Sequence, residues 1–406
     1  MADVAVTGLG MITPAGRTAP DTWRTVCEGR GLARPDPELT GLDVDISCRV
    51  DGFDADRELG RPLARRLDRF THLALVAARE AARDAGLAPG RWTAPRVGVV
   101  LGVGSNSLAT YLREFGRLQQ GQAELVSPLA LPRSVPNMAA AEIALDLEAT
   151  GPNFTVSSAC ASGATAVAVA AALLDSGACD VVLAGGAESG RSRMTATCFA
   201  RLRALSRRTA EPERASRPFD ADRDGLVLSE GAAVLVLERP GHARRRGAAV
   251  RALLRGHAVG CDAHHPVAPH PDGAGAERVL RAALAAARLA PRDVQHVNAH
   301  GTATRAGDAA EGRALQRVFA GAVPPVTAAK GVLGHALGAG GAIEAALTVL
   351  TLEHQLIPPT ANLGLQEAGP QLDIVTGRPR PAAVHTAVCN SFGFGGQNAV
   401  LVLSTP

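Results

Sequence analysis

Short valine-rich runs alternate along this chain with glycine-rich turns and alanine-rich segments of helical composition. A regular alternation of strands and helices predicts an α/β fold, and the apolar character of the runs predicts that its sheets are buried. After a first strand-like run at 4–6, the runs that we expect to form strands are 97–101, 180–184, 233–237, 294–298 and 399–403.

Parts of this pattern occur twice. Residues 81–89 lead into one valine-rich strand, and the similar residues 285–291 lead into another. A helix of small residues expected at 160–174 likewise has a counterpart at 338–352. Two repeated features in the same order predict two related halves, which share one core because no low-complexity linker separates them. The halves that we expect are residues 1–247 and residues 248–406.

The helix expected at 160–174 is uncharged until Asp175, and its small side chains would let neighbouring backbones approach closely, as in a helix packed on all sides. Cys160 stands at its start. There a thiol meets the positive end of the helix macrodipole and the free N–H groups of the first turn, which favour the thiolate and predict a nucleophile. The alternative is an inert buried cysteine, which is the more common role of this residue type.

Composition argues against several classes of protein. The 42 basic and 39 acidic residues nearly balance, so a dedicated nucleic-acid-binding protein is not expected. The seven cysteines include no Cys-x-x-Cys pair, which argues against a disulfide framework or a zinc site. Residues 261–270 hold a cysteine, an aspartate and three histidines, but in no zinc-like spacing, so we expect a surface loop and no metal. Without a basic, apolar leader or a membrane-spanning stretch, the chain is expected to be soluble and cytoplasmic.

Lys330 is the only lysine in a chain whose other basic residues are arginines. A position that keeps lysine where arginine is otherwise used suits a compact ammonium group and not a planar guanidinium. Lys330 is therefore a candidate site residue. The alternative is that this one lysine was retained by chance.

Three glycine-rich segments of the second half carry polar residues, at 298–304, 330–335 and 390–396. His300 follows an expected strand, at the carboxyl end where open α/β sheets bind ligands. Glycines beside His300 and His335 allow the backbone to approach a substrate closely. Two histidines and a unique lysine in such turns, together with a cysteine at a helix start, indicate a catalytic site.

Four ordered motifs carry a resemblance to a known family. They are 159–163, 298–302, 334–335 with Lys330, and 390–396, and 217–231 fits the same pattern. In these motifs the chain resembles the β-ketoacyl-acyl carrier protein synthases, closest to the elongating enzymes of type II fatty-acid synthesis and the ketosynthase subunits of type II polyketide systems. The resemblance implies the thiolase fold, in which two similar halves form a five-layered α-β-α-β-α sandwich, usually dimeric.

The reaction that this resemblance implies is a decarboxylating Claisen condensation. An acyl group moves from the phosphopantetheine of an acyl carrier protein to Cys160, and malonyl-carrier protein loses CO2 to give a carbanion that attacks the thioester. By resemblance His300 and His335 serve decarboxylation and condensation, because a neutral imidazole can donate its N–H to an oxygen that gains enolate charge. The main-chain N–H groups of Cys160 and Phe394 would form the oxyanion hole, and the ring of Phe394 would gate the acyl pocket.

The same resemblance implies supporting residues. Thr302 and Thr304 match positions that hydrogen-bond the pantetheine arm, and Lys330 would balance nearby acids and keep the histidines in their working protonation state. The acids are Glu344, Asp308 and Glu311. No cofactor is implied beyond the pantetheine that carries the substrates, but some members hold a structural monovalent cation in one region. The matching residues are Asn298, Glu344 and Asn390.

Pocket and docking residues also follow from the resemblance. Ser105 stands where the elongating enzymes often carry a bulkier aliphatic residue, which predicts a deeper or more polar acyl pocket, and Phe199 matches a pocket-lining phenylalanine. Exposed arginines would dock an acidic carrier protein, unless they form an ordinary solvated helix face. They are Arg61, Arg65, Arg66 and Arg203. Residues 123–126 lack the basic side chains expected there, so the choice of carrier protein stays open.

Two other functions are compatible with the same fold. A chain-length factor, the non-catalytic subunit of a heterodimeric polyketide synthase, lacks the nucleophile, so Cys160 with both histidines argues against it. Such a subunit is nevertheless a possible partner. A thiolase condenses coenzyme A thioesters without decarboxylation and needs a second cysteine as base, for which Cys389 is the candidate. Chain length, starter unit, pathway and the choice between homodimer and heterodimer stay open.

Overall fold

The computed structural model describes residues 2–90, 92–105, 107–367 and 371–406, and in this part of the chain ten strands form one mixed sheet. The strands of the first half are β1 (Val4–Ile12), β4 (Val97–Gly102), β5 (Asn153–Val156), β6 (Val181–Ser189) and β7 (Glu230–Glu238). Those of the second half are β8 (Ala252–Cys261), β9 (His296–Asn298), β10 (Val326–Thr327), β13 (Thr386–Gly393) and β14 (Gln397–Ser404). An antiparallel ladder between β1 and β8 joins the two halves.

Both halves have the same strand order. It reads β5-β4-β6-β7-β1 in the first half and β10-β9-β13-β14-β8 in the second. The directions match as well, since β4 runs parallel to β5 and β6, and β9 runs parallel to β10 and β13. This duplication confirms the two related halves, and the change from one to the other falls between β7 and β8. The boundary at residue 247 stays a prediction.

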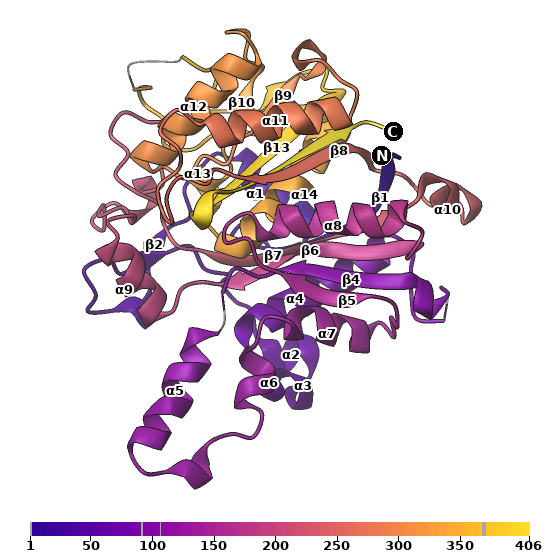
Figure 1. Cartoon of the computed structure of the whole chain (residues 1–406). Helices are drawn as coiled ribbons and strands as arrows, with labels where there is room; N and C mark the ends of the chain where they lie inside the picture. Colours follow the sequence, from indigo (N-terminus) through magenta and orange to yellow (C-terminus); the bar gives the residue numbers. More distant parts are fainter. Residues whose placement is uncertain (1, 91, 106, 368–370) are drawn as a thin grey trace.

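Helices separate and cover the two halves of the sheet (Figure 1). The middle layer holds α8 (Ser162–Asp175) and α14 (Gly340–His354). The outer face of the first half is covered by α4 (Arg69–Asp84) and α7 (Met138–Asp146). The outer face of the second half is covered by α11 (Ala274–Ala286) and α12 (Arg305–Val318). This order of layers is the expected α-β-α-β-α sandwich of the thiolase fold.

The two central helices meet through small residues. A Cβ atom on Gly163 of α8 would lie 2.6 Å from the backbone nitrogen of Ala342 in α14, and one on Gly341 would lie 2.8 Å from the nitrogen of Ala164. Such distances are too short for any side chain, so only glycine permits this approach of the backbones. The small-residue pattern was therefore correctly interpreted, although α8 begins at Ser162, two residues after the cysteine.

Shorter elements complete the fold. The helices are α1 (Ala19–Cys27), α2 (Ala55–Leu59), α3 (Arg61–Arg66), α5 (Leu108–Gln119), α6 (Ala130–Ser134), α9 (Arg193–Arg201), α10 (Pro240–Arg245) and α13 (Lys330–Leu333). Two small sheets pair β2 (Arg34–Pro35) with β3 (Ile46–Ser47), and β11 (Leu356–Ile357) with β12 (Arg380–Pro381). Of the helices in the described ranges, none combines the length and the apolar character that crossing a membrane requires.

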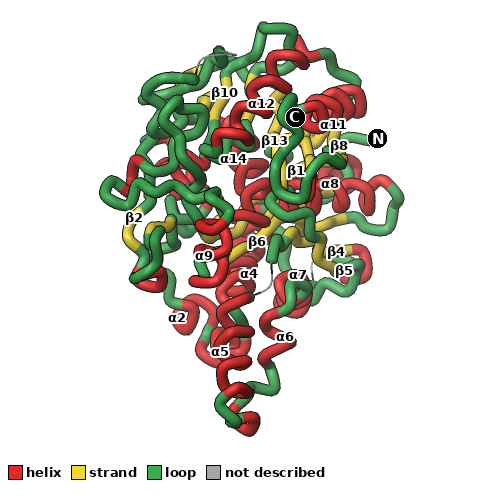
Figure 2. The backbone as a smooth tube through the Cα atoms, turned by 60° about the vertical axis from the view of Figure 1, so that its left-hand side comes forward, coloured by secondary structure: helices red, strands yellow, loops and turns green. Residues whose placement is uncertain are grey.

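One segment projects from the body of the molecule. α5 and α6 extend together away from the sheet (Figure 2). Buried Glu114 holds this projection together, because its carboxylate accepts hydrogen bonds from Arg117 at 2.8 Å, Arg133 at 3.2 Å and the backbone of Ser127 at 3.1 Å. These bonds to a charged acceptor lower the pKa of Glu114 to about 2, with the bond from Ser127 first among them.

Candidate active site

Cys160 lies in the turn between β5 and α8. Ala159 has a positive φ of 50°, a strained conformation for a residue with a side chain. The hydroxyl of Ser162 stabilises the turn by accepting from the backbone N–H of Ser158 at 2.9 Å and donating to the carbonyl of Ala159 at 2.6 Å. Gly393 packs against this turn, since a Cβ there would lie 2.9 Å from the nitrogen of Cys160. The sulfur is thereby fixed beside the end of β13.

The thiol of Cys160 differs in one respect from expectation. Burial raises the pKa of Cys160 to about 12, and this effect exceeds the opposite influence of the Lys330 charge and of the N–H groups that reach the sulfur. Burial therefore acts against the expected preference for the thiolate, which stays a prediction. The physical reason is that the turn places the sulfur in the interior, with 7% of the residue exposed, where a charge is costly.

The N–H groups that approach the sulfur are those of Cys160 itself and Phe394. These are the two groups expected to form an oxyanion hole. The ring of Phe394 stacks on that of Phe199 with a centroid distance of 5.6 Å and an interplanar angle of 21°. The structure thus brings the main chain of Phe394 to the nucleophile and its side chain to a second predicted pocket residue.

His300 follows β9 in a turn that a buried carboxylate shapes. Glu311 of α12 accepts hydrogen bonds from the backbone nitrogens of His300 and Gly301, both at 2.8 Å, and from the side-chain amide of Asn390 at 3.0 Å. Three donors converge on this one acid, so it positions the imidazole through its backbone. Glu311 itself does not reach the ring.

Lys330 lies behind His300 and is 3% exposed. Its ammonium group donates to the carbonyl of His300 at 2.7 Å, lies 3.3 Å from Nδ1 of the same residue, and pairs with Glu344. Because an ammonium group can only donate, Nδ1 acts as the acceptor and the neutral ring carries its proton on Nε2. The unique lysine therefore selects the tautomer of the histidine.

His335 meets His300 edge to face, with 5.4 Å between the ring centroids. The backbone of His335 is held between two neighbours, donating to Val227 at 2.8 Å and accepting from Ser229 at 3.1 Å. Burial, followed by the charge of Lys330, holds the pKa of both histidines well below the usual value of 6.5. Both rings are accordingly neutral at physiological pH.

The predicted charge network is smaller than expected. Of the three acids, only Glu344 forms an ion pair with Lys330. Asp308 lies 3.6 Å from the guanidinium of Arg223 and accepts from the backbone of Phe219 at 2.7 Å and Ala303 at 3.1 Å. Sequence separation does not show which cation an acid will face, so nothing in the sequence paired Asp308 with Arg223.

A pocket of about 590 Å³ joins the reactive groups. Its walls include Cys160, His300, His335, Thr302, Thr304, Phe199 and Phe394. The hydroxyls of the two threonines lie 2.9 Å apart, and Thr304 also caps α12 by accepting from the nitrogen of Gly307 at 3.2 Å. Five distant parts of the chain thus converge on one cavity.

Ser105 is outside this group. It does not line the pocket, and its hydroxyl donates to Glu188 at 3.1 Å. Glu188 is 3% exposed, and burial raises its pKa to about 7. The structure therefore gives Ser105 a hydrogen bond to a buried acid, and its expected place in an acyl pocket stays a prediction.

The four arginines expected to dock a carrier protein are exposed, but they differ in their partners. Arg66 pairs with buried Glu142 at 2.7 Å, and Arg61 lies 3.9 Å from Asp56. A salt bridge to a buried acid fixes Arg66 to the body of the protein, so part of its role is structural. Arg65 and Arg203 remain solvent-facing.

The loop at 261–270 has a role that the sequence did not reveal. Asp262 accepts from the side-chain amide of Asn398 at 2.7 Å, and the carbonyl of Pro266 accepts from the nitrogen of Gly395 at 2.7 Å. Val267 and Pro269 line the pocket. This segment is a wall of the site that holds the turn at Phe394, and not only a surface loop. The residues of this segment do not themselves predict its contact with the turn at Phe394.

Buried oxygens without partners mark one further place. Within the described ranges, Asn298 Oδ1, Asn390 Oδ1 and Glu344 Oε2 accept no hydrogen bond, although each residue is at most 2% exposed. Asn298 and Asn390 lie on the adjacent strands β9 and β13, and Asn298 also donates to the carbonyl of Glu344 at 3.0 Å. Uncompensated oxygens of this kind are the ligands that hard cations prefer, so these residues fit the monovalent cation considered above.

Comparisons with known proteins agree with this geometry. The sequence model for the beta-ketoacyl synthase N-terminal domain matches residues 1–243, and that for the C-terminal domain matches residues 251–364. A relative in Synechocystis sp., the 3-oxoacyl-[acyl-carrier-protein] synthase 2, is 40% identical over 405 residues that cover 98% of this chain and 97% of the relative.

Two solved structures are similar throughout. The ishigamide ketosynthase/chain length factor superposes with a TM-score of 0.93 at 33% identity, covering 100% of this chain and 99% of that one. A type II polyketide synthase acyl carrier protein complex with its ketosynthase gives a TM-score of 0.92 at 28% identity, covering 100% of both chains. With two domain models matched in order and a close relative over its full length, the chain belongs to the β-ketoacyl synthase family.

Proposed function

We propose that this protein catalyses the decarboxylating Claisen condensation of an acyl thioester on Cys160 with malonyl-acyl carrier protein, giving a β-ketoacyl-acyl carrier protein. The observation that carries the proposal is the shared pocket of Cys160, His300 and His335, with Lys330 bonded to His300 behind it. A nucleophile, two neutral N–H donors and a fixed cation are what the two half-reactions need.

In the first half-reaction, the sulfur of Cys160 attacks the carbonyl carbon of the acyl-pantetheine thioester. The oxyanion of the tetrahedral intermediate accepts hydrogen bonds from the N–H groups of Cys160 and Phe394. The carbon–sulfur bond to pantetheine then breaks, and the proton lost by Cys160 passes to the leaving pantetheine sulfur. His335 is the imidazole available to carry that proton, because Nδ1 of His300 accepts from Lys330 and its Nε2 already holds a proton.

In the second half-reaction, malonyl-carrier protein enters the same pocket. Nε2–H of His300 donates to the malonyl thioester oxygen, and His335 supplies the second imidazole. The bond between the malonyl α-carbon and its carboxylate breaks, and CO2 leaves. The electron pair of that bond stays on the α-carbon as an enolate, which attacks the acyl carbon on Cys160. Collapse of the second tetrahedral intermediate releases the product, elongated by two carbons, and the thiolate of Cys160, which takes one proton from water to restore the thiol.

The nucleophile can be tested directly. In Cys160→Ala, we expect no acyl group on the protein by mass spectrometry after incubation with acyl-carrier protein, and no chain extension with malonyl-carrier protein. Cys27→Ala is the matched control, because Cys27 is outside the pocket. Chain extension by Cys160→Ala at the wild-type rate would exclude the proposed reaction, while an unchanged circular dichroism spectrum confirms that the variant is folded.

A thiolase is the second candidate, and the position of Cys389 disfavours it. Burial raises the pKa of this thiol, which is 0% exposed on β13 and does not line the pocket. A thiol enclosed in this way cannot serve as the base of a thiolase. We therefore expect no condensation of acetyl-coenzyme A alone, measured as acetoacetyl-coenzyme A by its absorbance, whereas a thiolase would form it.

We also propose that a second thiolase-fold subunit covers the projection formed by α5 and α6. Large apolar side chains there are 46–62% exposed: Leu112, Phe115, Leu118, Leu125 and Leu131. An apolar surface of this kind usually marks an interface. The related ketosynthase/chain length factor structure leaves both a second copy and a chain-length factor as candidates.

The oligomeric state tests this interface. Purified alone, the protein should be a homodimer of about twice its chain mass by light scattering, and Phe115→Glu should shift it toward the monomer. Glu124→Lys, a charge change within the same projection, is the control. A wild-type monomer that dimerises only with a cysteine-lacking ketosynthase-like chain would favour the heterodimer, and a monomer under every condition would contradict the proposal.

Carrier-protein docking is proposed for the exposed arginines Arg65 and Arg203. Charge reversal at Arg203 should raise KM for acyl-carrier protein at least tenfold without changing the rate with a short pantetheine thioester, since only the carrier protein is acidic. Arg292→Glu, at another exposed arginine, is the control. An equal effect on both substrates would place Arg203 in a structural role.

We further propose that Asn298, Asn390 and Glu344 hold a monovalent cation that stabilises the site. Exchange of K+ or Na+ for choline at constant ionic strength should lower Tm by several degrees, and Asn298→Ala should remove that difference. An identical Tm in all three salts would contradict the proposal. We place the reaction in the cytoplasm, where the seven free cysteines, Cys160 among them, stay reduced.

A further inference from the structure

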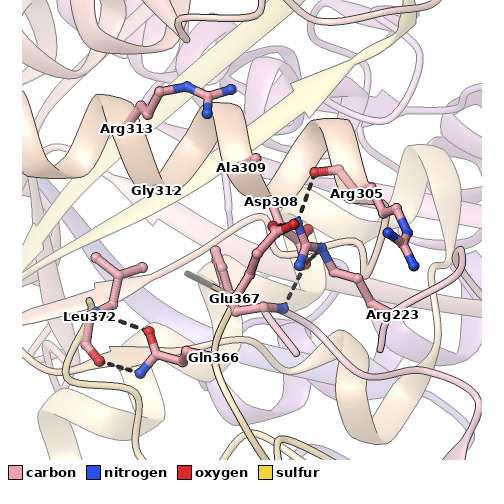
Figure 3. A pocket seen from close by; sticks show the side chains of 10 residues that line it. Arg223, Arg305, Asp308, Ala309, Gly312, Arg313, Gln366, Glu367 and Leu372 are labelled. Carbon is pink, nitrogen blue, oxygen red and sulfur yellow. Dashed lines mark hydrogen bonds and ion pairs between the residues drawn. The ribbon is translucent and has the colours of Figure 1, made fainter. Parts of the chain in front are cut away.

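A second pocket lies beside the catalytic one, on another face of α12. Thr304 and Gly307 line the catalytic pocket, whereas Arg305, Asp308 and Arg313 line a separate groove of about 710 Å³ (Figure 3). The other side of the groove is formed by Phe219, Arg223, Gln366, Glu367 and Leu372. Nothing in the proposed condensation uses these residues.

The floor of the groove is open because α12 presents small residues there. Ala309 and Gly312 lie between the two arginines, and a Cβ atom on Gly312 would meet only the side chain of Leu372, at 3.9 Å. Arg305 and Arg313 are eight residues apart, which places their backbones about 12 Å apart along the helix. A small molecule could therefore lie along α12 with one guanidinium near each end.

Arg223 forms the back of the groove and is fully engaged. It is 1% exposed and donates to the carbonyls of Thr304 at 3.2 Å, Asp220 at 2.8 Å and Arg305 at 2.9 Å. Its remaining strong bond is to the carboxylate of Glu367 at 2.6 Å. Arg223 thus fixes the walls, and its charge is balanced by Glu367 and by Asp308, which lies 3.6 Å away.

The other two arginines keep an unbalanced charge. Within the ranges that the structure describes, neither Arg305 nor Arg313 has a carboxylate within salt-bridge distance, and Arg313 donates only to the carbonyl of Pro271. Both are close enough to act on Glu367, whose pKa is held below its usual range by the bond from Arg223 and by their charges. The groove therefore holds three guanidinium groups and two carboxyl groups, Glu367 and buried Asp308, and keeps an excess of positive charge.

We propose that this groove binds a phosphate-bearing small molecule, with Arg305 and Arg313 as its charge partners. A phosphate dianion matches two guanidinium groups in charge and offers oxygens for their paired N–H donors. Glu367 opposes the ligand, because its carboxylate lies in the same positive field. Free phosphate and the phosphate of a nucleotide share this chemistry, and the experiment separates them.

Isothermal titration calorimetry tests the groove with two probes, inorganic phosphate and adenosine 3′,5′-bisphosphate, which has no pantetheine arm to enter the catalytic pocket. We expect saturable binding that Arg305→Gln and Arg313→Gln each weaken at least tenfold. Glu367→Gln should tighten binding severalfold, since it removes a negative charge. Arg292→Gln, which removes the same charge elsewhere, should change nothing.

The affinities of the two probes for wild type and variants decide between the outcomes. Tighter binding of the bisphosphate than of inorganic phosphate would identify a nucleotide as the source, and equal affinity would identify free phosphate; both results support the site. No saturable binding of either probe would overturn the proposal, as would equal affinity in wild type and Arg305→Gln. Glu367→Gln keeps the test informative if an arginine variant fails to fold.

Discussion

Lys330 joins His300 to the buried acid Glu344, so replacing it with methionine should cost both stability and activity. In choline salts, where no K+ or Na+ is present to bind Glu344, loss of the ammonium group leaves this acid protonated, because 2% exposure gives its charge almost no water. Its pKa is already about 7, against 4.5 for the free group, with Lys330 in place. Loss of the ammonium group raises this pKa further. Because the wild-type carboxyl already carries about 3 kcal/mol of this penalty at pH 7, the added cost in the variant is about 0.4 kcal/mol at pH 7 and about 1.4 kcal/mol at pH 8.

The pH dependence of this loss has a definite sign. The folded variant keeps a proton on Glu344 that the unfolded chain releases above pH 4.5, so the native state binds more protons and its stability falls as pH rises. Relative to wild type, whose Glu344 loses its proton near pH 7, we expect an extra slope of about 1 kcal/mol per pH unit between pH 7 and 8 in Lys330→Met. The double variant Lys330→Met/Glu344→Leu removes both partners and should regain most of the stability and lose the extra slope.

Activity should not return with stability. Nδ1 of His300 has lost its donor in both variants, so the Nε2–H tautomer is no longer selected, and we expect decarboxylation of malonyl-carrier protein to fall about 100-fold in each. Urea unfolding at pH 6, 7 and 8 and the release of CO2 measure the two effects separately. The reasoning is refuted if Lys330→Met is as stable as wild type at pH 8, or if the double variant recovers both stability and activity.

Three further predictions concern other buried positions. Alkylation of Cys160 by iodoacetamide, followed on its peptide by mass spectrometry, should rise about tenfold per pH unit from pH 7 to 10, since its pKa is about 12; a plateau below pH 8 would show a stabilised thiolate. His296 has no hydrogen-bond partner for either ring nitrogen among the described residues, and burial lowers its pKa to about 3. His296→Phe should add about 1–2 kcal/mol of stability at pH 7. It should also reduce the loss of stability below pH 6.5, because there the histidine of the unfolded chain binds a proton that the buried ring of the folded protein does not bind. Equal pH profiles of the two proteins in urea unfolding would contradict this. Gly163→Ala should lower the unfolding free energy by about 1–3 kcal/mol by separating α8 from α14, whereas Gly116→Ala, in a helix with open space around it, should raise it by about 0.5–1 kcal/mol; the same sign for both would refute the packing argument.

The elements that depend on local pattern were predictable from the sequence. The strand runs correspond to β4, β6, β7, β9 and β14, although β9 is shorter than expected and spans only His296–Asn298. The small-residue helices and the duplication were also visible, because close packing of α8 on α14 requires glycine and alanine at the contact. These features are encoded in residues near one another along the chain.

Contacts across the fold were not predictable in the same way. The sequence placed Asp308 with Lys330, but the structure places it beside Arg223, and Ser105 turns out to bond to Glu188. Such pairings depend on which loops meet at the edge of the sheet, and a short stretch of sequence does not contain that information. For the same reason, the position of Cys160 at a helix start did not show that the turn before α8 buries its thiol.

The duplicated sheet explains how these distant residues meet. Cys160 precedes α8, and His335 precedes α14, its counterpart in the other half. His300 follows β9, which is the counterpart of β4 in the first half. Gly104, just after β4, packs closely on Gly338, since a Cβ atom on Gly104 would lie 3.1 Å from the nitrogen of Gly338. The corresponding loops of the two halves therefore converge where α8 and α14 touch, and the first half supplies a nucleophile where the second supplies donors. A substitution that separates these two helices should accordingly impair catalysis before it unfolds the protein, because the sulfur and the imidazoles are attached to opposite sides of that contact.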